Sequence, residues 1–473
     1  MRKKLRTGTL AFSTNIGGVL TRRTIQIEFN ELSPTLLEEF IDAGELPNFR
    51  RLRDSCETFV TDASGEVTLE PWVQWPTLHT GIPDRDHGIQ YLGQARLVRG
   101  RGLARELATA GFKVGVFGSM NLDYGPLNGF VMHDPWNAGS SPHPAGLRAF
   151  TDFVSSAVQE NSTDRLDKRA AAAFVGYLAT HGLTFNTAVT VARHLLDESR
   201  DRGLRWRRSL ILDAIAYDVF RTLVRRHDVA YATFFSNSTA HLQHYFWRNF
   251  RPEGFSTPPP RDDHSSLADA ILTGYRENDR LIGRLLSDFP EDRLIFVTAL
   301  SQQAWDTTKC MHRPKNFDNL LQLLGIDTSR TAVEPVMAEE FYLAFADGAA
   351  ADYAVERLSK SRIGAEPLFQ LERKDALLVK VGCAVYNFLA DDAIVELPDG
   401  TLVGFGELFY RIHGVRSGRH HPDGCFWVQS PNPREGMQKV PLTAVAPTIL
   451  QLFDVDIPSY MREPPIALAE LQQ

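Results

Sequence analysis

Three stretches of this chain carry histidines, amides and carboxylates at spacings that could support acid–base or metal chemistry. In the segment 417–424 (Ser-Gly-Arg-His-His-Pro-Asp-Gly), a Gly-x-His-x-Pro-x-Gly pattern predicts a turn that presents His420. Asn237 and His241 follow an apolar run, and Glu70 lies in a stretch rich in aromatic residues. An imidazole beside a carboxylate can move protons, and imidazoles also bind zinc.

Four motifs occur in a fixed chain order: 46–52 (Leu-Pro-Asn-Phe-Arg-Arg-Leu), 80–89 (Thr-Gly-Ile-Pro-Asp-Arg-Asp-His-Gly-Ile), 417–424, and 445–450 (Val-Ala-Pro-Thr-Ile-Leu). Together they resemble the alkaline phosphatase superfamily, in particular its type I phosphodiesterase/nucleotide pyrophosphatase branch. The resemblance spans residues 24 to 460, apart from two long insertions. It implies two metal ions, generally zinc, which hold a phosphoryl or sulfuryl group while a Ser, Thr or modified Cys attacks it.

Most of the metal ligands that the resemblance requires are absent. The first-strand motif normally ends in Asp followed by Gly, four residues ahead of a Pro, and counting back from Pro34 gives Asn30. The nucleophile position, nine residues before the Thr of a Thr-Gly pair, falls on Pro71. The later Asp-His pair is replaced by Leu300 and Ser301. We therefore expect one of the two metal sites to be abolished, because these side chains cannot hold a divalent ion.

The other metal site keeps two histidines. The Asp-x-x-x-His motif survives with Asn237 in place of the carboxylate, so His241 and His420 remain. Two imidazoles and an amide could hold zinc weakly, with His244 as a third nitrogen ligand, but neutral ligands have no Coulomb attraction for a dication. We expect no cofactor. If one zinc ion is bound, we expect His241, His420 and Asn237 to be its ligands.

Polar and aromatic residues surround the lost nucleophile position, and they leave two interpretations open. In one, the site has decayed, and Trp72, Trp75 and Trp247 are core aromatics. In the other, aromatic walls and amides form a rebuilt pocket that places an acid and a base around a substrate. Its candidates are, for catalysis, Glu70 (a general base, or else an exposed loop carboxylate), His241 and His420, and for substrate binding, Asn30, Gln74, Trp75, Asn237, His244 and Gln302. His87 is expected to fix the turn before Gly88.

Four short apolar runs next to helical patterns predict a mostly parallel sheet with helices on both faces. The runs are residues 25–29, 111–117, 229–235 and 293–298. Ligands of such sheets bind beyond the carboxyl ends of the strands, where Asn30, Ser119, Asn237 and Leu300 lie. The predicted fold class is therefore α/β, an alkaline phosphatase-like core with a helical insertion and a small α+β insertion.

Changes in periodicity along the chain predict the domain boundaries. Helical periodicity over 170–178 and 209–224 favours a helical cap, whereas 310–405 mixes helical and strand-like patterns. The predicted segments are an N-terminal extension (1–23), three parts of one core domain (24–140, 229–309 and 406–473), a helical cap insertion (141–228) and an α+β insertion (310–405).

Composition excludes several classes of protein. Hydrophobic content of 43% and charged content of 23% are ordinary for a globular chain, and the net charge of -7 is spread without a basic patch for nucleic acid. Four cysteines without C-x-x-C spacing predict free thiols in a reducing compartment, hence a cytoplasmic location. No apolar run is long enough to cross a bilayer, so no membrane partner is expected. The oligomeric state stays open.

Two classes of function remain. The first is an enzyme that has left two-metal hydrolysis and acts on an anionic small molecule bearing phosphate, sulfate or carboxylate, with Asn30 and Asn237 as donors to the anion. The second is a non-catalytic protein that binds or scaffolds a phosphorylated or sulfated ligand. Decay tends to leave small or apolar residues, whereas Asn30, Asn237, Gln302 and Gln303 are amides that can point at ligand oxygens. The sequence therefore favours a working pocket.

Overall fold

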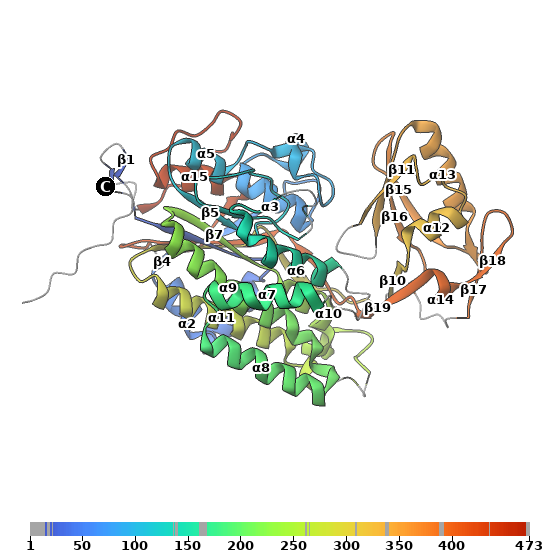
Figure 1. Ribbon diagram of the computed structural model, residues 1–473, viewed down its shortest axis with the longest axis horizontal. Coiled ribbons are helices and arrows are strands. Elements are labelled where there is room, and N and C mark those ends of the chain that lie inside the picture. Colours follow the sequence, from blue (N-terminus) through green and yellow to red (C-terminus); the bar gives the residue numbers. More distant parts are fainter. Residues whose placement is uncertain are drawn as a thin grey trace, which may run out of the picture. The chain divides into compact units, whose positions relative to one another are not determined.

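The chain was analysed as a computed structural model that describes residues 15–16, 19–20, 22–135, 137, 141–159, 168–260, 263, 265–307, 310–335, 340–386, 392–434 and 436–469. Most of the predicted N-terminal extension (1–23) lies outside these residues, although the short strands β1 (Asn15–Ile16) and β2 (Val19–Leu20) pair within it. The chain forms two compact units (Figure 1). We call them the core unit, comprising Met1–Gln243, Asp262–Gln303 and His420–Gln473, and the second unit, comprising His244–Arg261 and Ala304–Arg419.

The core unit contains an eight-stranded sheet in which only β21 runs against its neighbours. In spatial order the strands are β22 (Gln438–Pro441), β4 (Cys56–Asp62), β21 (Asp423–Gln429), β8 (Arg293–Val297), β3 (Thr24–Phe29), β7 (Tyr231–Ser236), β5 (Val114–Phe117) and β6 (Phe130–Met132). The four predicted apolar runs form β8, β3, β7 and β5, which lie side by side and parallel. The predicted α/β class with a mostly parallel sheet is thereby confirmed.

The central strand β3 is apolar on one face and polar on the other, although both faces are buried. Ile25 and Ile27 point to one side, and Gln26, Glu28 and the following Asn30 point to the other, because successive side chains of a strand alternate. Burying a polar row is costly unless each group finds a hydrogen-bond partner. The polar face of β3 therefore requires a second set of polar groups packed against it.

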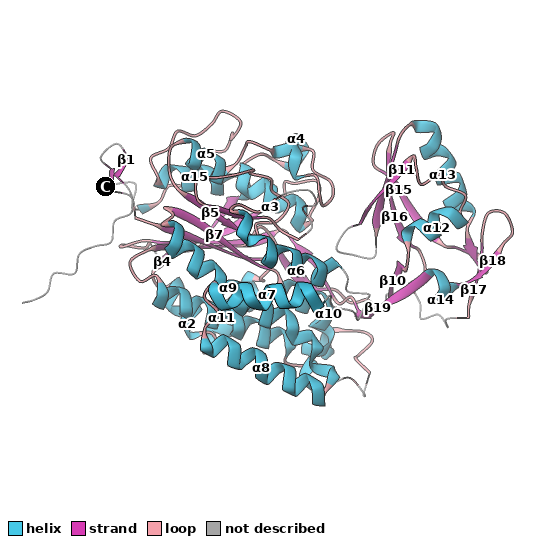
Figure 2. Ribbon diagram, in the orientation of Figure 1, coloured by secondary structure: helices cyan, strands magenta, loops and turns pink. Residues whose placement is uncertain are grey.

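Helices form a layer on each face of the sheet (Figures 1 and 2). On the apolar face of β3 lie α1 (Pro34–Asp42), α2 (Pro47–Arg53), α9 (Arg208–His227) and α11 (Ala270–Asp288), and on the polar face α3 (Pro71–Thr80), α5 (Leu103–Thr109) and α15 (Val445–Leu452). Three of these helices, α1, α2 and α3, begin with Pro, whose missing N–H is not needed in the first turn. Because α9 packs on β5 and β7, the last helix of the segment predicted as a cap belongs to a sheet layer.

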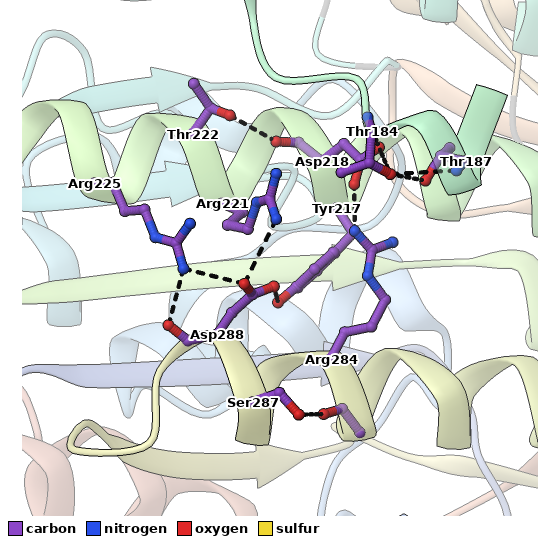
Figure 3. A network of polar contacts seen from close by, with 11 residues as sticks. Thr184, Thr187, Tyr217, Asp218, Arg221, Thr222, Arg225, Arg284, Ser287 and Asp288 are labelled. Atoms are coloured by element: carbon purple, nitrogen blue, oxygen red, sulfur yellow. Dashed lines mark hydrogen bonds and ion pairs between the residues drawn. The ribbon is translucent and has the colours of Figure 1, made fainter.

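A polar network joins the helices before and after β7 (Figure 3). The fully buried Asp218 on α9 forms an ion pair with Arg284 on α11 and accepts a hydrogen bond from the backbone N–H of Thr184 at 2.8 Å. Thr184 caps α8 (Phe185–Arg200), which follows α6 (Arg148–Gln159) and α7 (Lys168–Thr180). The neighbouring Tyr217 donates to Asp288, one turn after Arg284 on α11, at 2.9 Å. The network therefore fastens α8 and α11 to α9.

The second unit combines small antiparallel sheets with helices around a core of its own, which includes Leu343, Leu358 and Val379. One sheet has the order β11 (Thr331–Pro335), β12 (Phe341–Phe345), β16 (Leu378–Cys383) and β15 (Phe369–Arg373), and the other β14 (Glu366–Pro367), β13 (Arg362–Ile363), β17 (Ile394–Glu396) and β18 (Leu402–Gly404). The remaining elements are β10 (Cys310–Pro314), β19 (Phe409–Val415), α12 (Phe317–Leu323), α13 (Gly348–Lys360) and α14 (Phe405–Leu408). None of the described helices has the length and hydropathy of a membrane span.

Candidate active site

Two amides meet at the carboxyl ends of neighbouring strands in the core unit. Asn30 follows β3 and Asn237 follows β7, and Nδ2 of Asn30 donates to Oδ1 of Asn237 at 2.7 Å. The two residues are 207 positions apart in sequence. The edge of the sheet where ligand sites form in parallel α/β folds thus brings together two of the predicted residues.

The amide of Asn30 is fully engaged within the protein. Its Oδ1 accepts from the indole Nε1 of Trp75 at 2.7 Å, and because an indole N–H can only donate, this contact fixes which way the amide points. The two protons of Nδ2 then go to Asn237 and to Oε1 of Glu31, the latter at 2.9 Å. This corrects the prediction that Asn30 donates to a bound anion, since its protons already have protein acceptors.

Glu31 supplies the carboxylate that position 30 lacks, and inspection of the sequence motifs missed it. It occupies the position where the resembled motif has Gly, and its φ of 60° lies in the left-handed region that glycine adopts without strain. Its buried side chain takes hydrogen bonds from Asn30 and from Nε2 of Gln302. Its backbone carbonyl accepts from Gln243 at 2.6 Å. A strained residue held by this many contacts is typical of a functional site. The sequence signal that could have identified Glu31 is a Glu at the position where the resembled motif has Gly.

His420 lies between two carboxylates. Its Nε2 is 3.4 Å from Oε2 of Glu31, and its Nδ1 is 3.5 Å from Oε2 of Glu70. The predicted turn around it is instead the strand β20 (Gly418–His421), and Pro422 separates β20 from β21. The side chains become more accessible along this row, from 2% for Glu31 to 9% for His420 and 27% for Glu70. The row thus leads from the interior to a solvent-accessible carboxylate.

Glu70 precedes the first turn of α3. Pro71 is the first helical residue, and the carbonyl of Glu70 accepts from the backbone N–H groups of Val73 and Gln74, each at 2.9 Å. Its side chain does not cap the helix, although a carboxylate in that place often does. It turns toward His420 instead. Pro71, at the position where the resembled motif has its nucleophile, therefore has no nucleophilic atom. The carboxylate of the adjacent Glu70 lies in the site instead.

The loop before Glu70 is held by a second pair of carboxylates. Glu66 accepts from the backbone N–H of Asp84 at 2.6 Å, and Asp84 accepts from the backbone N–H of Thr68, also at 2.6 Å. Burial, together with the charge of Asp84, raises the pKa of Glu66 to about 7. Gln74 is buried and donates to the carbonyl of Thr68 at 2.7 Å. Gln74 therefore fixes this loop rather than facing a ligand, which corrects its assignment to substrate binding.

Two further residues assigned to substrate binding lie inside the protein. Trp75 is 0% exposed, so it cannot form the wall of an open pocket, and its contacts are with Asn30 and with the rings of His79 and Phe235. Gln302 is buried, and its Nε2 donates to Glu31 and to the carbonyl of Ala240. Both residues hold groups of the site in place by hydrogen bonds, Trp75 to Asn30 and Gln302 to Glu31. A sequence cannot distinguish a supporting aromatic residue from a lining one.

The two histidines after Asn237 lie on α10 (Ser238–Phe250). His241 is an exposed residue, yet the protein around its imidazole lowers the pKa of the ring by desolvation, which favours the neutral form. His244 belongs to the second unit, where its carbonyl accepts from the backbone N–H of Ser417 at 2.7 Å. Their roles in catalysis and substrate binding remain predictions.

His87 fixes a turn, in the way that the sequence predicted. Its Nδ1 accepts from the backbone N–H of Ile89 at 3.0 Å, and its Nε2 lies 3.0 Å from the hydroxyl of Thr77. Burial lowers the pKa of His87 to about 4, which keeps the Nδ1 lone pair available for that N–H. The histidine is thus a neutral structural residue.

Of the predicted metal ligands, His420 fits a cation site together with Glu31, which was not predicted, and Asn237 does not. Nε2 of His420 and Oε2 of Glu31 are spaced like two ligands of one zinc ion, which lie about 3.3 Å apart in a tetrahedral site. Asn237 is a poor ligand because its Oδ1 already accepts from Asn30. Without a cation, two carboxylates around one imidazole repel an anion. The charge at His420 therefore suits a proton or a cation.

No family model and no curated protein matches this chain. Among solved structures, murine ectonucleotide pyrophosphatase/phosphodiesterase 5 is 10% identical, with a TM-score of 0.44, over 92% of this chain and 96% of that one. An inactive variant of the same murine protein in complex with AMP gives the same values. The human protein is 9% identical, with a TM-score of 0.43 and the same coverage. At such low identities and TM-scores, the function has to be argued from the site.

Proposed function

We propose that this chain is a divergent enzyme of the alkaline phosphatase superfamily that acts on a small molecule bearing a phosphate, sulfate or carboxylate group without two-metal catalysis. The observation that carries the proposal is the row Glu31–His420–Glu70, in which an imidazole is placed between a buried and an accessible carboxylate. A chain that had only lost its metals would have no reason to keep a strained, fully hydrogen-bonded carboxylate at Glu31.

In this proposal, each of the three side chains of the row has a different role in proton transfer. Glu70, the most accessible, is the general base that takes a proton from an attacking water or from a substrate hydroxyl. His420 then shares that proton through Nδ1, and Glu31 stabilises the positive charge that develops on the ring. The proton returns along the same path to the leaving group. Such proton transfer typically contributes 10²–10⁴-fold to a rate.

The anionic part of the substrate needs a donor away from the carboxylates. Asn237 is half-buried, and its Oδ1 is committed to Asn30, so its Nδ2 protons are available to a ligand. Solvent-accessible His241 follows one helical turn later. If a divalent ion is present, Glu31 and His420 would hold it, and it would supply positive charge against which the anionic group could bind.

The test combines metal analysis with a substrate screen. Protein purified without chelators is assayed for metal content and for turnover of aryl phosphates, aryl phosphodiesters, aryl sulfates and carboxylic esters, with and without zinc. We expect at most one equivalent of metal, turnover of one class, and a loss of at least ~100-fold in Glu70→Gln. Glu45→Gln, which removes an exposed partner of Arg276, is the control and should be unchanged.

Two results would overturn this assignment. Two bound zinc ions with turnover on the order of 1 to 1,000 per second would show that two-metal catalysis survives. Binding of a phosphorylated or sulfated compound without turnover of any probe would instead support the second candidate, a non-catalytic protein that binds or scaffolds such a ligand. Pro71 at the nucleophile position is the observation that keeps this candidate open.

A further inference from the structure

A buried carboxylate–imidazole pair lies on the polar face of β3, the face that also carries Asn30. Oε1 of Glu28 is 2.9 Å from Nε2 of His79, and both side chains are 0% exposed. Glu28 also accepts from Nε2 of Gln26 at 2.7 Å and from Oγ of Ser119 at 2.8 Å. Burying a carboxylate and an imidazole is costly unless hydrogen bonds compensate for the lost water, and apolar residues of similar size often stabilise such a position as well or better. The pair therefore points to a requirement other than stability.

The pair is connected to the site through one tryptophan. His79 and Trp75 are one turn apart on α3, and their ring centroids are 6.2 Å apart. On its other side, Trp75 meets the ring of Phe235 edge-on at 5.3 Å. Its indole N–H, which can only donate, reaches Oδ1 of Asn30 at 2.7 Å. The indole is thus fixed from two sides, and its one polar atom points at the residue that holds Glu31.

The polar partners of the two ring nitrogens of His79 favour one orientation of the ring. Nε2 faces the carboxylate of Glu28, and Nδ1 lies 3.1 Å from the hydroxyl of Tyr124. Burial and the charge of Glu28 raise the pKa of Tyr124, which keeps that hydroxyl protonated and able to donate to Nδ1. Each ring nitrogen thus has a polar partner within 3.1 Å, and rotating the ring would separate both pairs. The ring therefore limits how Trp75 can move.

We infer that Trp75 is a positioning residue for the proposed acid–base row, and that the buried Glu28–His79 pair fixes Trp75 in this role. The indole N–H holds the Asn30 amide with its oxygen away from Glu31 and its Nδ2 toward it. Without that N–H, the amide can turn and present its oxygen to the carboxylate, which would push Glu31 away from His420. This inference rests on the proposed function of the row, but its geometry can be tested independently.

The test compares two tryptophans of α3, each replaced by phenylalanine so that each loses its indole N–H. Trp75→Phe keeps an aromatic ring and removes the N–H to Asn30. Trp72→Phe removes an N–H that donates to the carbonyl of Gln90 at 3.2 Å, away from the row, and is the control. The readouts are a crystal structure of each variant, hydrogen exchange of the Asn30 side-chain amide followed by NMR, and the melting temperature.

We expect both variants to fold with similar losses of melting temperature. In Trp75→Phe alone, the Asn30 amide should exchange about ten-fold faster and the Glu31 carboxylate should leave its place beside His420. With a substrate from the screen, kcat should fall in Trp75→Phe while KM stays within about two-fold. An unmoved Glu31 and unchanged Asn30 exchange in Trp75→Phe would overturn the inference, even if the protein proves to have no activity.

His79→Gln provides a second test if Trp75→Phe does not fold. This substitution removes the imidazole ring that limits the movement of Trp75 and leaves the indole N–H in place. The Asn30 side-chain amide should therefore exchange faster than in the unmodified protein. In the control Trp72→Phe, the exchange rate of that amide should equal the rate in the unmodified protein. Faster exchange in both variants would show a general loosening of α3 and contradict the inference.

Discussion

Nδ2 of Asn30 donates to Oε1 of Glu31 at 2.9 Å, so the neutral amide that replaces an expected metal ligand holds a carboxylate one residue further along the chain. The negative charge lies at position 31 and not at position 30. The site is therefore acidic although the carboxylate ligands that the resemblance implies are missing. Glu31 is thus the first residue to test.

We predict that Glu31→Gln removes at least ~100-fold of the activity while the protein stays folded. Glutamine has nearly the same shape, but it cannot stabilise a charged His420, and its amide NH₂ group must face one of the donors Asn30 and Gln302. Activity and melting temperature are measured together on the variant. Full activity would mean that Glu31 is structural and that Glu70 works without it.

A set of three histidine variants separates the site from its surroundings. We predict that His420→Ala and His241→Ala abolish function, whereas His421→Ala is mild, because Nδ1 of His421 accepts the backbone N–H of Asp423 at 3.2 Å and takes no part in the row. Melting temperature and ligand binding are measured on all three. Equal, mild effects would exclude His420 and His241 from the site and favour the binding-scaffold candidate.

The buried turn at His87 predicts a pH-dependent stability. Its folded-state pKa of about 4 lies below the ordinary value of 6.5, so the unfolded chain binds a proton more readily than the folded one. The stabilisation is therefore complete above pH 6.5 and is lost as the pH falls toward 4, by about 3 kcal/mol.

Urea unfolding at pH 7 and pH 4.5 checks this prediction on the unmodified protein and on His87→Asn. The asparagine oxygen can still accept the backbone N–H of Ile89, but it does not titrate. The variant should lose less stability between the two pH values. An identical loss in both proteins would assign the pH dependence to other groups.

The network of Figure 3 predicts that one substitution far from the site lowers the free energy of unfolding strongly. Asp218→Ala leaves the Arg284 guanidinium and the N–H of Thr184 without their buried acceptor, which should cost about 3 kcal/mol or more of unfolding free energy. Asp288→Ala is the control, because Asp288 is partly exposed and its partner Arg225 is half exposed, so the loss should be smaller. Equal losses would show that burial does not set the strength of these pairs.

The sequence predicted the four central strands because each is a short apolar run next to a helical pattern, and such runs specify a sheet buried on both faces. The strands β4 and β21 were not predicted, because β4 mixes polar and apolar residues and β21 begins at Asp423 and Gly424, inside the segment predicted as a turn. The turn predicted at His420 proved to be a strand, because β20 pairs with β9 (Ser301–Ala304), a partner more than a hundred residues away that the local pattern of Gly and Pro does not reveal.

The site was predicted less completely than the sheet. Asn30 and Asn237 were identified because motif spacing places each at the end of a strand, Glu70 because it precedes the nucleophile position, and His420 from the Gly-x-His pattern of a predicted turn. Glu31 was missed because its importance lies in a left-handed backbone and in donors from distant segments. Trp75 and Gln74 were assigned to the pocket because residue type does not reveal on which side of a helix a partner lies.

The left-handed conformation of Glu31 has a consequence for protein engineering. A procedure that chooses residues for compatibility with the local backbone, or from the resembled motif, would place Gly at this position, where a positive φ causes no strain. The redesigned protein would keep its sheet and helices and lose the buried carboxylate of the proposed acid–base row. Position 31 should therefore be held constant when this chain is stabilised, and it offers a direct way to produce a folded, inactive version.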